Sequence, residues 1–191
     1  MSKGVFNVPV ATNEPVKSYE PGSAEREELL STYQAMYNST TNVPLYIGGE
    51  TIHTSEKINM VPPHNHQHVL GNFYMAGENE VSEAIESSML AWNTWSKTSL
   101  EERTKIFRKA AELLQGPWRD TINAATMLNQ SKNAFQAEID AACELIDFFN
   151  FNCQYAEDIH NNQPLISPEG CLLYTSPSPR DEKVSRMPSS A

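Results

Sequence analysis

The second half of the chain, from residue 78 onward, carries its apolar side chains at a helical period, which limits the possible folds more than any other feature. In its first segment, spacings of four and three residues relate Val81, Ile85, Ser88, Trp92 and Trp95. These spacings place both tryptophans on one face of a predicted helix. The sequence therefore predicts an α-rich half whose first helix has an apolar face.

Two local signals divide this half into further helices. Ser99-Leu100-Glu101-Glu102 has the form of a capping box, in which the serine hydroxyl and the glutamate carboxylate each satisfy an unpaired amide. Gly116-Pro117 ends the helix that this box begins, because proline cannot continue a helix. The inward face of this helix is predicted to hold Ile106, Ala110, Leu113 and Leu114.

The last predicted helix contains QAEIDAACELIDFFNFN, residues 136–152, in which four carboxylates stand among large apolar side chains. At about 100° per residue, one face of this helix holds Ile139, Ala142, Ile146, Phe149 and Cys153. Asp140, Glu144 and Asp147 lie on the opposite face, which is usually the solvated one. No histidine joins these acids at helical ligand spacing, so the pattern predicts no metal site here.

Aromatic side chains flank one of these acids and favour a second interpretation. Phe148 and Phe151 follow Glu144 by four and seven residues, and Tyr155 lies on the same side. A fully solvated face rarely carries so much aromatic area. Glu144 is therefore predicted to line a partly covered cleft.

Before residue 78 the sequence predicts short elements. They are an extended arm over residues 1–24, a helix over residues 25–37, a hairpin with strands at 43–47 and 51–54, and a second strand pair at 57–61 and 69–75. The glycine pair Gly48-Gly49 connects the strands of the hairpin. The string PPHNHQH connects the second pair.

Three imidazoles in that string raise the question of a metal. On a strand, His64, His66 and His68 would share a face and could converge on one ion. The preceding Pro62-Pro63 and the following Gly71 indicate a turn, where this alignment fails. The sequence thus offers only a weak metal motif and identifies no metal ligand.

Nucleotide binding and nucleophilic catalysis have little local support. The eight glycines include no GxG, so no dinucleotide fingerprint or P-loop identifies a cofactor-binding residue. Cys143 and Cys153 have no histidine at a recognisable spacing, and both are interpreted as buried small apolar residues. The residues alone therefore identify no catalytic side chain.

Composition bounds the class of protein. With 191 residues, 39% of them hydrophobic, the chain can form one compact domain. Its net charge of −10 argues against nucleic acid and anionic membrane surfaces as partners. No apolar run is long enough to span a bilayer, and the first residues suit neither a secretory signal nor a transit peptide. Three cysteines without CxxC favour a reducing compartment, so the cytoplasm is expected.

The helical periodicity ends near residue 170. The following string, CLLYTSPSPRDEKVSRMPSSA, carries three of the twelve prolines of the chain. One interpretation is a disordered tail. The other, which we favour, is that residues 171–191 are foreign to the domain formed by residues 25–170.

Several stretches together resemble one family. VPLYIGGETIHT, the tryptophan helix and ERTKIFRKAAELLQG resemble the N-terminal part of an aldehyde dehydrogenase. Within that superfamily, NEPV near the start, GPWRD and above all QAEIDAACELIDFF resemble the Δ1-pyrroline-5-carboxylate dehydrogenases. The resemblance covers residues 12–164. It implies an α/β fold of the aldehyde dehydrogenase type, truncated to its N-terminal part of mostly α-helices with short β-hairpins.

The resemblance also implies an activity. Such enzymes oxidise L-glutamate γ-semialdehyde to L-glutamate with NAD, the second step of proline degradation. A thiolate attacks the aldehyde, hydride passes to nicotinamide, and water activated by a glutamate hydrolyses the thioester. The catalytic cysteine, that glutamate and the cofactor-binding loops lie in later segments of the family, so the resemblance implies that this chain alone is inactive.

One site residue transfers by resemblance. The acid of the AELIDFF segment lies beside the aldehyde entrance in the family, and its counterpart here is Glu144, with an implied role in substrate binding. The family also forms homo-oligomers. Eukaryotic members are mitochondrial, which makes the mitochondrial matrix the alternative compartment.

Helices that pack on a cofactor domain in the family would lack that partner here. The side chains expected to expose apolar patches are Trp92, Trp95, Ile146 and Phe149. The chain alone is therefore expected to be poorly stable. Two other functions stay open, namely a non-catalytic helical interaction module and a dehydrogenase for a different aldehyde.

Overall fold

The computed structural model describes residues 7–162, and the predicted tail lies outside them. Residues 7–23 form an arm without helix or strand. The elements that follow are α1 (Ala24–Tyr37), β1 (Thr41–Val43), β2 (Leu45–Ile47), β3 (Glu50–Ile52), β4 (Lys57–Met60), β5 (Gly71–Tyr74), α2 (Glu78–Trp95), α3 (Leu100–Gln115), α4 (Arg119–Gln130), α5 (Ala134–Ala137), the π-helix η1 (Glu138–Cys143) and α6 (Glu144–Asn161). The mostly helical composition with short strands agrees with the expected fold class.

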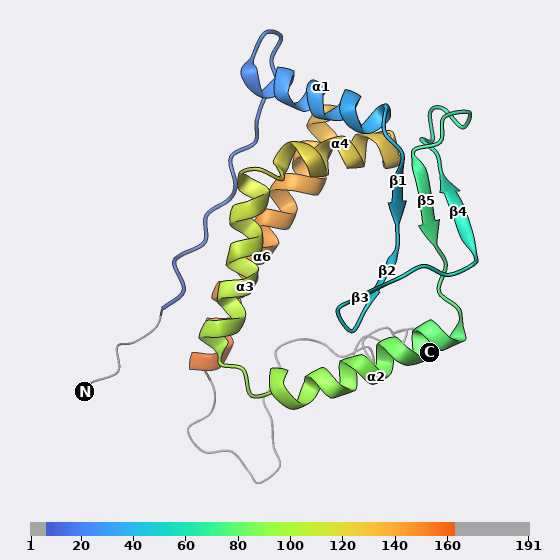
Figure 1. The fold of residues 1–191 in the computed structure, drawn as a ribbon. Helices are drawn as coiled ribbons and strands as arrows, with labels where there is room; N and C mark the ends of the chain where they lie inside the picture. Colours follow the sequence, from blue (N-terminus) through green and yellow to red (C-terminus); the bar gives the residue numbers. More distant parts are fainter. Residues whose placement is uncertain (1–6, 163–191) are drawn as a thin grey trace, which may run out of the picture.

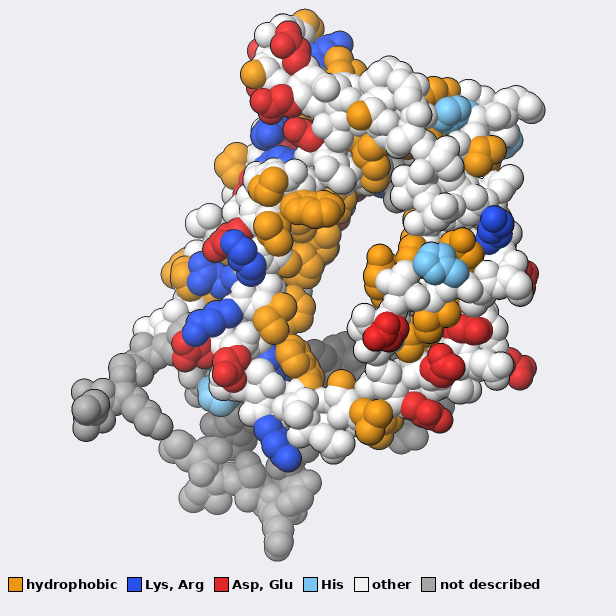
Figure 2. All heavy atoms as spheres, viewed as in Figure 1, with side chains coloured by type: hydrophobic (Ala, Val, Ile, Leu, Met, Phe, Trp, Pro, Cys, Tyr) orange, Lys and Arg blue, Asp and Glu red, His pale blue; other side chains and the backbone are white. Residues whose placement is uncertain are grey.

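These elements are arranged as a frame (Figure 1). Helices α3 and α6 pack along each other on one side, and α1 packs on α4 above them. The strands form the opposite side, and α2 runs below. The space-filling view is open in the middle of this frame, where hydrophobic side chains face the opening (Figure 2).

Both predicted strand pairs are confirmed. Strands β2 and β3 pair antiparallel around Gly48 and Gly49, whose φ angles of 61° and 88° suit glycine. Strand β4 pairs antiparallel with β5. The sequence did not predict that β1 pairs parallel with β5. This pairing depends on Gly71, because a Cβ there would lie 1.7 Å from the Thr41 carbonyl oxygen.

The capping box of α3 is confirmed, but the prediction of its buried face is largely wrong. The Ser99 hydroxyl accepts from the Glu102 N–H, and the Glu102 carboxylate accepts from the Ser99 N–H. The buried residues of α3 are Thr104 and Ala111. Of the predicted inward residues, Leu114 packs on the core, whereas Ile106 and Leu113 are exposed. Ala111 lies in the cluster with Ala142 and Ile146 where α3 packs against α6.

The final helix is not a regular α-helix. Its residues 138–143 form a π-helix, in which the Glu144 N–H donates to the Ile139 carbonyl oxygen. The predicted buried positions Ala142, Ile146 and Cys153 are confirmed. Glu138 is also fully buried, which the sequence analysis did not predict.

Two small apolar clusters form the core. One joins Tyr19, Leu29 and Ala124, and the other joins Ala111, Ala142 and Ile146. Helix α2 has no buried residue, and Trp92 and Trp95 are exposed as expected. The expectation that Ile146 would be exposed is wrong, because α3 covers it.

Large apolar side chains are exposed on several elements, including Met89 and Trp92 on α2 and Trp118 before α4. Among residues 7–162, the helices are all too short or too polar to cross a membrane.

Candidate functional site

A buried polar cluster joins the arm to the helices. At its centre, the Arg119 guanidinium forms ion pairs with Glu14 of the arm and with Glu138 of η1. Arg119 also donates to the Pro15 carbonyl oxygen at 2.8 Å. The side chains of Arg119 and Glu138 are 4% and 0% exposed, so their opposite charges compensate each other away from water.

Glu138 accepts hydrogen bonds at both oxygens. Its Oε1 accepts from the Lys17 N–H, and its Oε2 accepts from the Tyr19 hydroxyl and the Asn123 amide, each at 2.8 Å. Burial raises the pKa of Glu138, but the hydrogen bonds from Arg119 and these three donors outweigh burial and lower the pKa to about 2. Burial and the Glu138 carboxylate raise the pKa of Tyr19. The cluster is therefore a fixed structural anchor.

This cluster was not predicted, although the sequence contains a signal for it. An ideal helix places Glu138 on the same face as Ala142 and Ile146, since each follows the last by four residues. A buried carboxylate requires a cation or several donors. Arg119, in the GPWRD stretch, is that cation.

Glu144 lies in the surroundings that its aromatic neighbours predicted. A groove of about 440 Å³ is lined by Asn13, Glu144, Asp147, Phe148, Phe151, Asn152 and Tyr155. Glu144 is exposed, and its carboxylate forms no hydrogen bond or ion pair with any other described residue. A carboxylate without a partner beside aromatic rings is suited to an ammonium group, which both charge and ring faces attract.

The two neighbouring acids have partners of their own. Asp147 accepts from the Glu14 N–H and the Asn13 side-chain amide, each at 2.7 Å. Asp147 is half-buried, so its predicted solvated position is only partly correct, because the arm packs on one side of it. Asp140 is exposed, as predicted, and pairs with Lys132 at 2.6 Å. Of the three acids on this face, Glu144 is the one whose carboxylate has no partner among residues 7–162.

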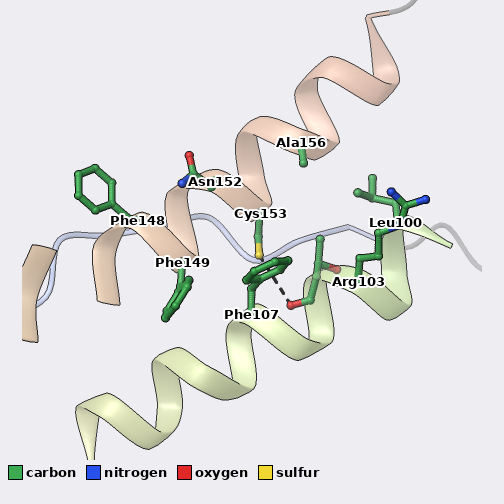
Figure 3. Close-up of a pocket in the computed structure, with 9 residues that line it drawn as sticks. Leu100, Arg103, Phe107, Phe148, Phe149, Asn152, Cys153 and Ala156 are labelled. Atoms are coloured by element: carbon green, nitrogen blue, oxygen red, sulfur yellow. Dashed lines mark hydrogen bonds between the residues drawn. The ribbon is translucent and has the colours of Figure 1, made fainter. Parts of the chain in front are cut away.

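A second groove, of about 350 Å³, separates α3 from α6 (Figure 3). Its lining is mainly apolar, and the Phe107 and Phe149 rings lie with centroids 5.9 Å apart. Phe148 lines this groove and the Glu144 groove, so it forms the ridge between them. The Cys153 thiol points to the Thr104 carbonyl oxygen at 3.7 Å and offers no reactive group to the groove.

Both described cysteines are buried, as predicted. Burial, with the Glu138 carboxylate nearby, raises the pKa of Cys143 to about 11. Burial also raises the pKa of Cys153. Neither thiol is suited to act as a nucleophile, because nucleophilic cysteines have lowered pKa values.

The histidine string forms turns, as predicted. The His68 ring stacks on Tyr37 with centroids 3.9 Å apart, and His68 Nε2 hydrogen-bonds to the Tyr37 carbonyl oxygen at 2.7 Å. His64 Nδ1 lies 2.8 Å from the Ser131 hydroxyl. These two imidazoles thus fix the turns against α1 and the end of α4. Within residues 7–162, no three His, Cys, Asp or Glu side chains are grouped as metal ligands.

Comparison with known proteins identifies the scaffold that carries this groove. A model of the aldehyde dehydrogenase family matches residues 51–180. The chain belongs to the aldehyde dehydrogenase family. This confirms the expected family and fold class. The match extends past the predicted boundary at residue 170, and the foreign origin of residues 171–191 stays a prediction.

The most similar relatives share one name. Human mitochondrial Δ1-pyrroline-5-carboxylate dehydrogenase is 40% identical over 156 residues, which are 82% of this chain and 28% of that protein. The crystal structure of the Δ-pyrroline-5-carboxylate dehydrogenase from Mycobacterium tuberculosis aligns with a TM-score of 0.83 at 42% identity, over 87% of this chain and 31% of that chain. A second crystal structure of the mycobacterial enzyme, bound with NAD, aligns equally well. This family member thus spans under a third of the length of these relatives.

Proposed function

We propose that the chain supplies the substrate-entrance helices of an NAD-dependent dehydrogenase that oxidises L-glutamate γ-semialdehyde to L-glutamate in proline degradation. The observation that carries the proposal is Glu144, whose carboxylate has no partner among residues 7–162 and lies in an aromatic groove of an aldehyde dehydrogenase scaffold. The names of the similar proteins support the same substrate.

The groove suits one end of this substrate. The semialdehyde carries an α-ammonium group, which a carboxylate and aromatic ring faces attract together. Phe148, Phe151 and Tyr155 provide the rings, and Glu144 provides the charge. Glu144 therefore selects and orients an amino-acid aldehyde and takes no part in proton transfer.

The chemical step belongs to other parts of such an enzyme. The raised pKa values and burial of Cys143 and Cys153 support placing the catalytic cysteine outside the described residues. We place the catalytic glutamate there too, because Glu138 is held by five donor contacts from Lys17, Tyr19, Asn123 and Arg119. The chain alone is then expected to be inactive.

The described residues do not fit NAD, which supplies the hydride acceptor in this reaction. A pyrophosphate needs free N–H groups at a helix start, usually after a glycine-rich turn. At the starts of α1, α2, α3 and α5, one N–H each is instead taken by the side chain of Ser23, Glu80, Ser99 and Asn133, respectively. The cofactor is therefore assigned to segments outside residues 7–162.

Partners and compartment are part of the same proposal. A small-molecule aldehyde is the partner at the groove, and the complete enzyme is a homo-oligomer. The cytoplasm is the proposed compartment, and the mitochondrial matrix, from which the human relative takes its name, is the alternative.

The test uses the enzyme expressed from the complete gene. NADH formation is followed with the semialdehyde, comparing wild type with Glu144→Gln. Glutamine removes the charge that pairs with the substrate ammonium group. KM for the semialdehyde is therefore expected to rise about tenfold, while KM for NAD is unchanged. Asp140→Asn is the matched control, because Asp140 lies one turn away on the same helix and pairs with Lys132.

Three outcomes are distinguishable. Unchanged semialdehyde kinetics in Glu144→Gln would contradict the role of Glu144. A wild-type enzyme that prefers an aldehyde without an amino group would favour the other-aldehyde alternative. A gene product that oxidises no aldehyde would favour the non-catalytic module.

A further inference from the structure

The arm is attached to the helices through a regular series of hydrogen bonds, in which backbone N–H groups of the arm donate to side chains of η1 and α6. The donor and acceptor pairs are Val8 N–H to Glu157 at 2.7 Å, Ala11 N–H to Gln154 at 2.8 Å, Glu14 N–H to Asp147 at 2.7 Å and Lys17 N–H to Glu138 at 2.8 Å. The donors are spaced by three residues, and the acceptors run in the opposite direction along η1 and α6.

A three-residue repeat is typical of an extended polyproline-type segment, which presents every third residue on one side. Pro9 and Pro15 lack an N–H and fall between the donor positions. The Glu14 side chain fixes the register, because it pairs with the buried Arg119 and accepts from Gln115 Nε2 at 2.6 Å. The arm is therefore held in one position along α6.

This register places Asn13 at the Glu144 groove. Asn13 Nδ2 donates to Asp147 Oδ2 at 2.7 Å, while the next residue, Glu14, donates its N–H to Asp147 Oδ1. Both oxygens of Asp147 are thus directed to the arm. Asp147 follows Glu144 by one helical turn, and Asn13, Asp147 and Glu144 line the same groove.

We propose that Asn13 is a positioning residue for substrate recognition, an inference that rests on the proposed function. Without its amide, Asp147 Oδ2 would turn to the groove as a second anion and compete with Glu144 for the substrate ammonium. With the amide, Glu144 is the one carboxylate of this groove that has no partner within residues 7–162. Asn13 therefore sets the preference for an aldehyde with an amino group, although it lies more than a hundred residues before Glu144 in the chain.

The experiment measures that preference in the enzyme from the complete gene. Two aldehydes are compared, L-glutamate γ-semialdehyde and glutarate semialdehyde, which has the same chain and carboxylate but no amino group. In Asn13→Ala, kcat/KM for L-glutamate γ-semialdehyde is expected to fall about three- to tenfold, which is the effect of losing one hydrogen bond. The fall should come from a higher KM. The kcat for L-glutamate γ-semialdehyde and the kcat/KM for glutarate semialdehyde should not change.

Two further variants separate positioning from simple attachment of the arm. Asn13→Gln keeps the amide donor and should restore most of the preference. Thr12→Ala alters the neighbouring exposed residue, which does not line the Glu144 groove, and should leave both substrates unaffected.

The inference is overturned if Asn13→Ala lowers activity equally with both aldehydes, or if the preference is unchanged. Failure of the proposed function is seen in the wild-type enzyme itself, which would then prefer glutarate semialdehyde or oxidise neither aldehyde.

Discussion

Replacing Glu138 by glutamine tests how far the buried cluster stabilises the fold. Oε1 accepts from Lys17 N–H and Arg119, and Oε2 accepts from Tyr19, Asn123 and Arg119. Glutamine turns one oxygen into a donor group, so two or three of these donors lose their acceptor. An orphaned buried donor costs about 1–3 kcal/mol, so we expect a loss of about 4 kcal/mol in the free energy of unfolding.

The pKa of Glu138 gives a second route to this magnitude. A shift from the ordinary 4.5 to about 2 corresponds to about 3 kcal/mol of stability at neutral pH. Because the folded-state pKa is depressed, this contribution is complete above pH 4.5 and is lost as pH falls towards 2. The difference between wild type and Glu138→Gln should therefore shrink across that window.

The assay is urea unfolding followed by circular dichroism, at pH 7 and at points down to the acid limit of the fold. Asp140→Asn makes the same chemical change nearby, at a carboxylate whose partner Lys132 is partly exposed. Exposed pairs contribute up to about 1 kcal/mol, so this control should lose little stability. The reasoning is refuted if Glu138→Gln loses no more stability than Asp140→Asn.

Three other changes test the packing and the thiols. Ile146→Ala removes a fully buried side chain between α3 and α6 and should cost about 2–5 kcal/mol in the same unfolding assay. Gly71→Ala places a Cβ against the Thr41 carbonyl at a φ of 149°, so it should break the β1–β5 pairing and speed amide exchange there. Iodoacetamide at pH 8 should alkylate Cys143 far more slowly than a free cysteine, as peptide mass mapping would show, because its pKa is about 11. Rapid alkylation of native Cys143 would contradict its burial.

The elements that were predicted correctly are those that depend on neighbouring residues in the sequence. The capping box at Ser99 and the glycine turn at Gly48 depend on neighbouring residues, so their sequences determine them. The parallel pairing of β1 with β5 depends on segments about thirty residues apart and has no local pattern. The face of α3 was misjudged because hydrophobicity alone does not show which side a close helix contact selects.

The candidate site follows the same division. Phe148, Phe151 and Tyr155 follow Glu144 on one helix, so simple spacing predicted the groove. Asn13 could not be placed there from sequence, because only the folded arm brings it to Asp147.

The three short motifs that resemble the Δ1-pyrroline-5-carboxylate dehydrogenases meet in the folded chain. Glu14 belongs to NEPV, Arg119 to GPWRD and Glu138 to QAEIDAACELIDFF. Arg119 forms a buried ion pair with each of the two glutamates. What the sequence presents as separate similarities is therefore one structural unit. Each of the three charged side chains requires the others, because a buried charge that loses its partner destabilises the fold.

The π-helix connects this buried unit to the groove. Glu138 begins η1 and Glu144 follows its last residue, with the Glu144 N–H bound five residues back to Ile139. The wider turn lets Ala142 and Cys143 both point inward and then directs Glu144 outward. Loss of Glu138 should therefore disturb the groove as well as the stability of the fold. Loss of Glu144 should leave stability unchanged, because its carboxylate forms no hydrogen bond or ion pair with the described residues.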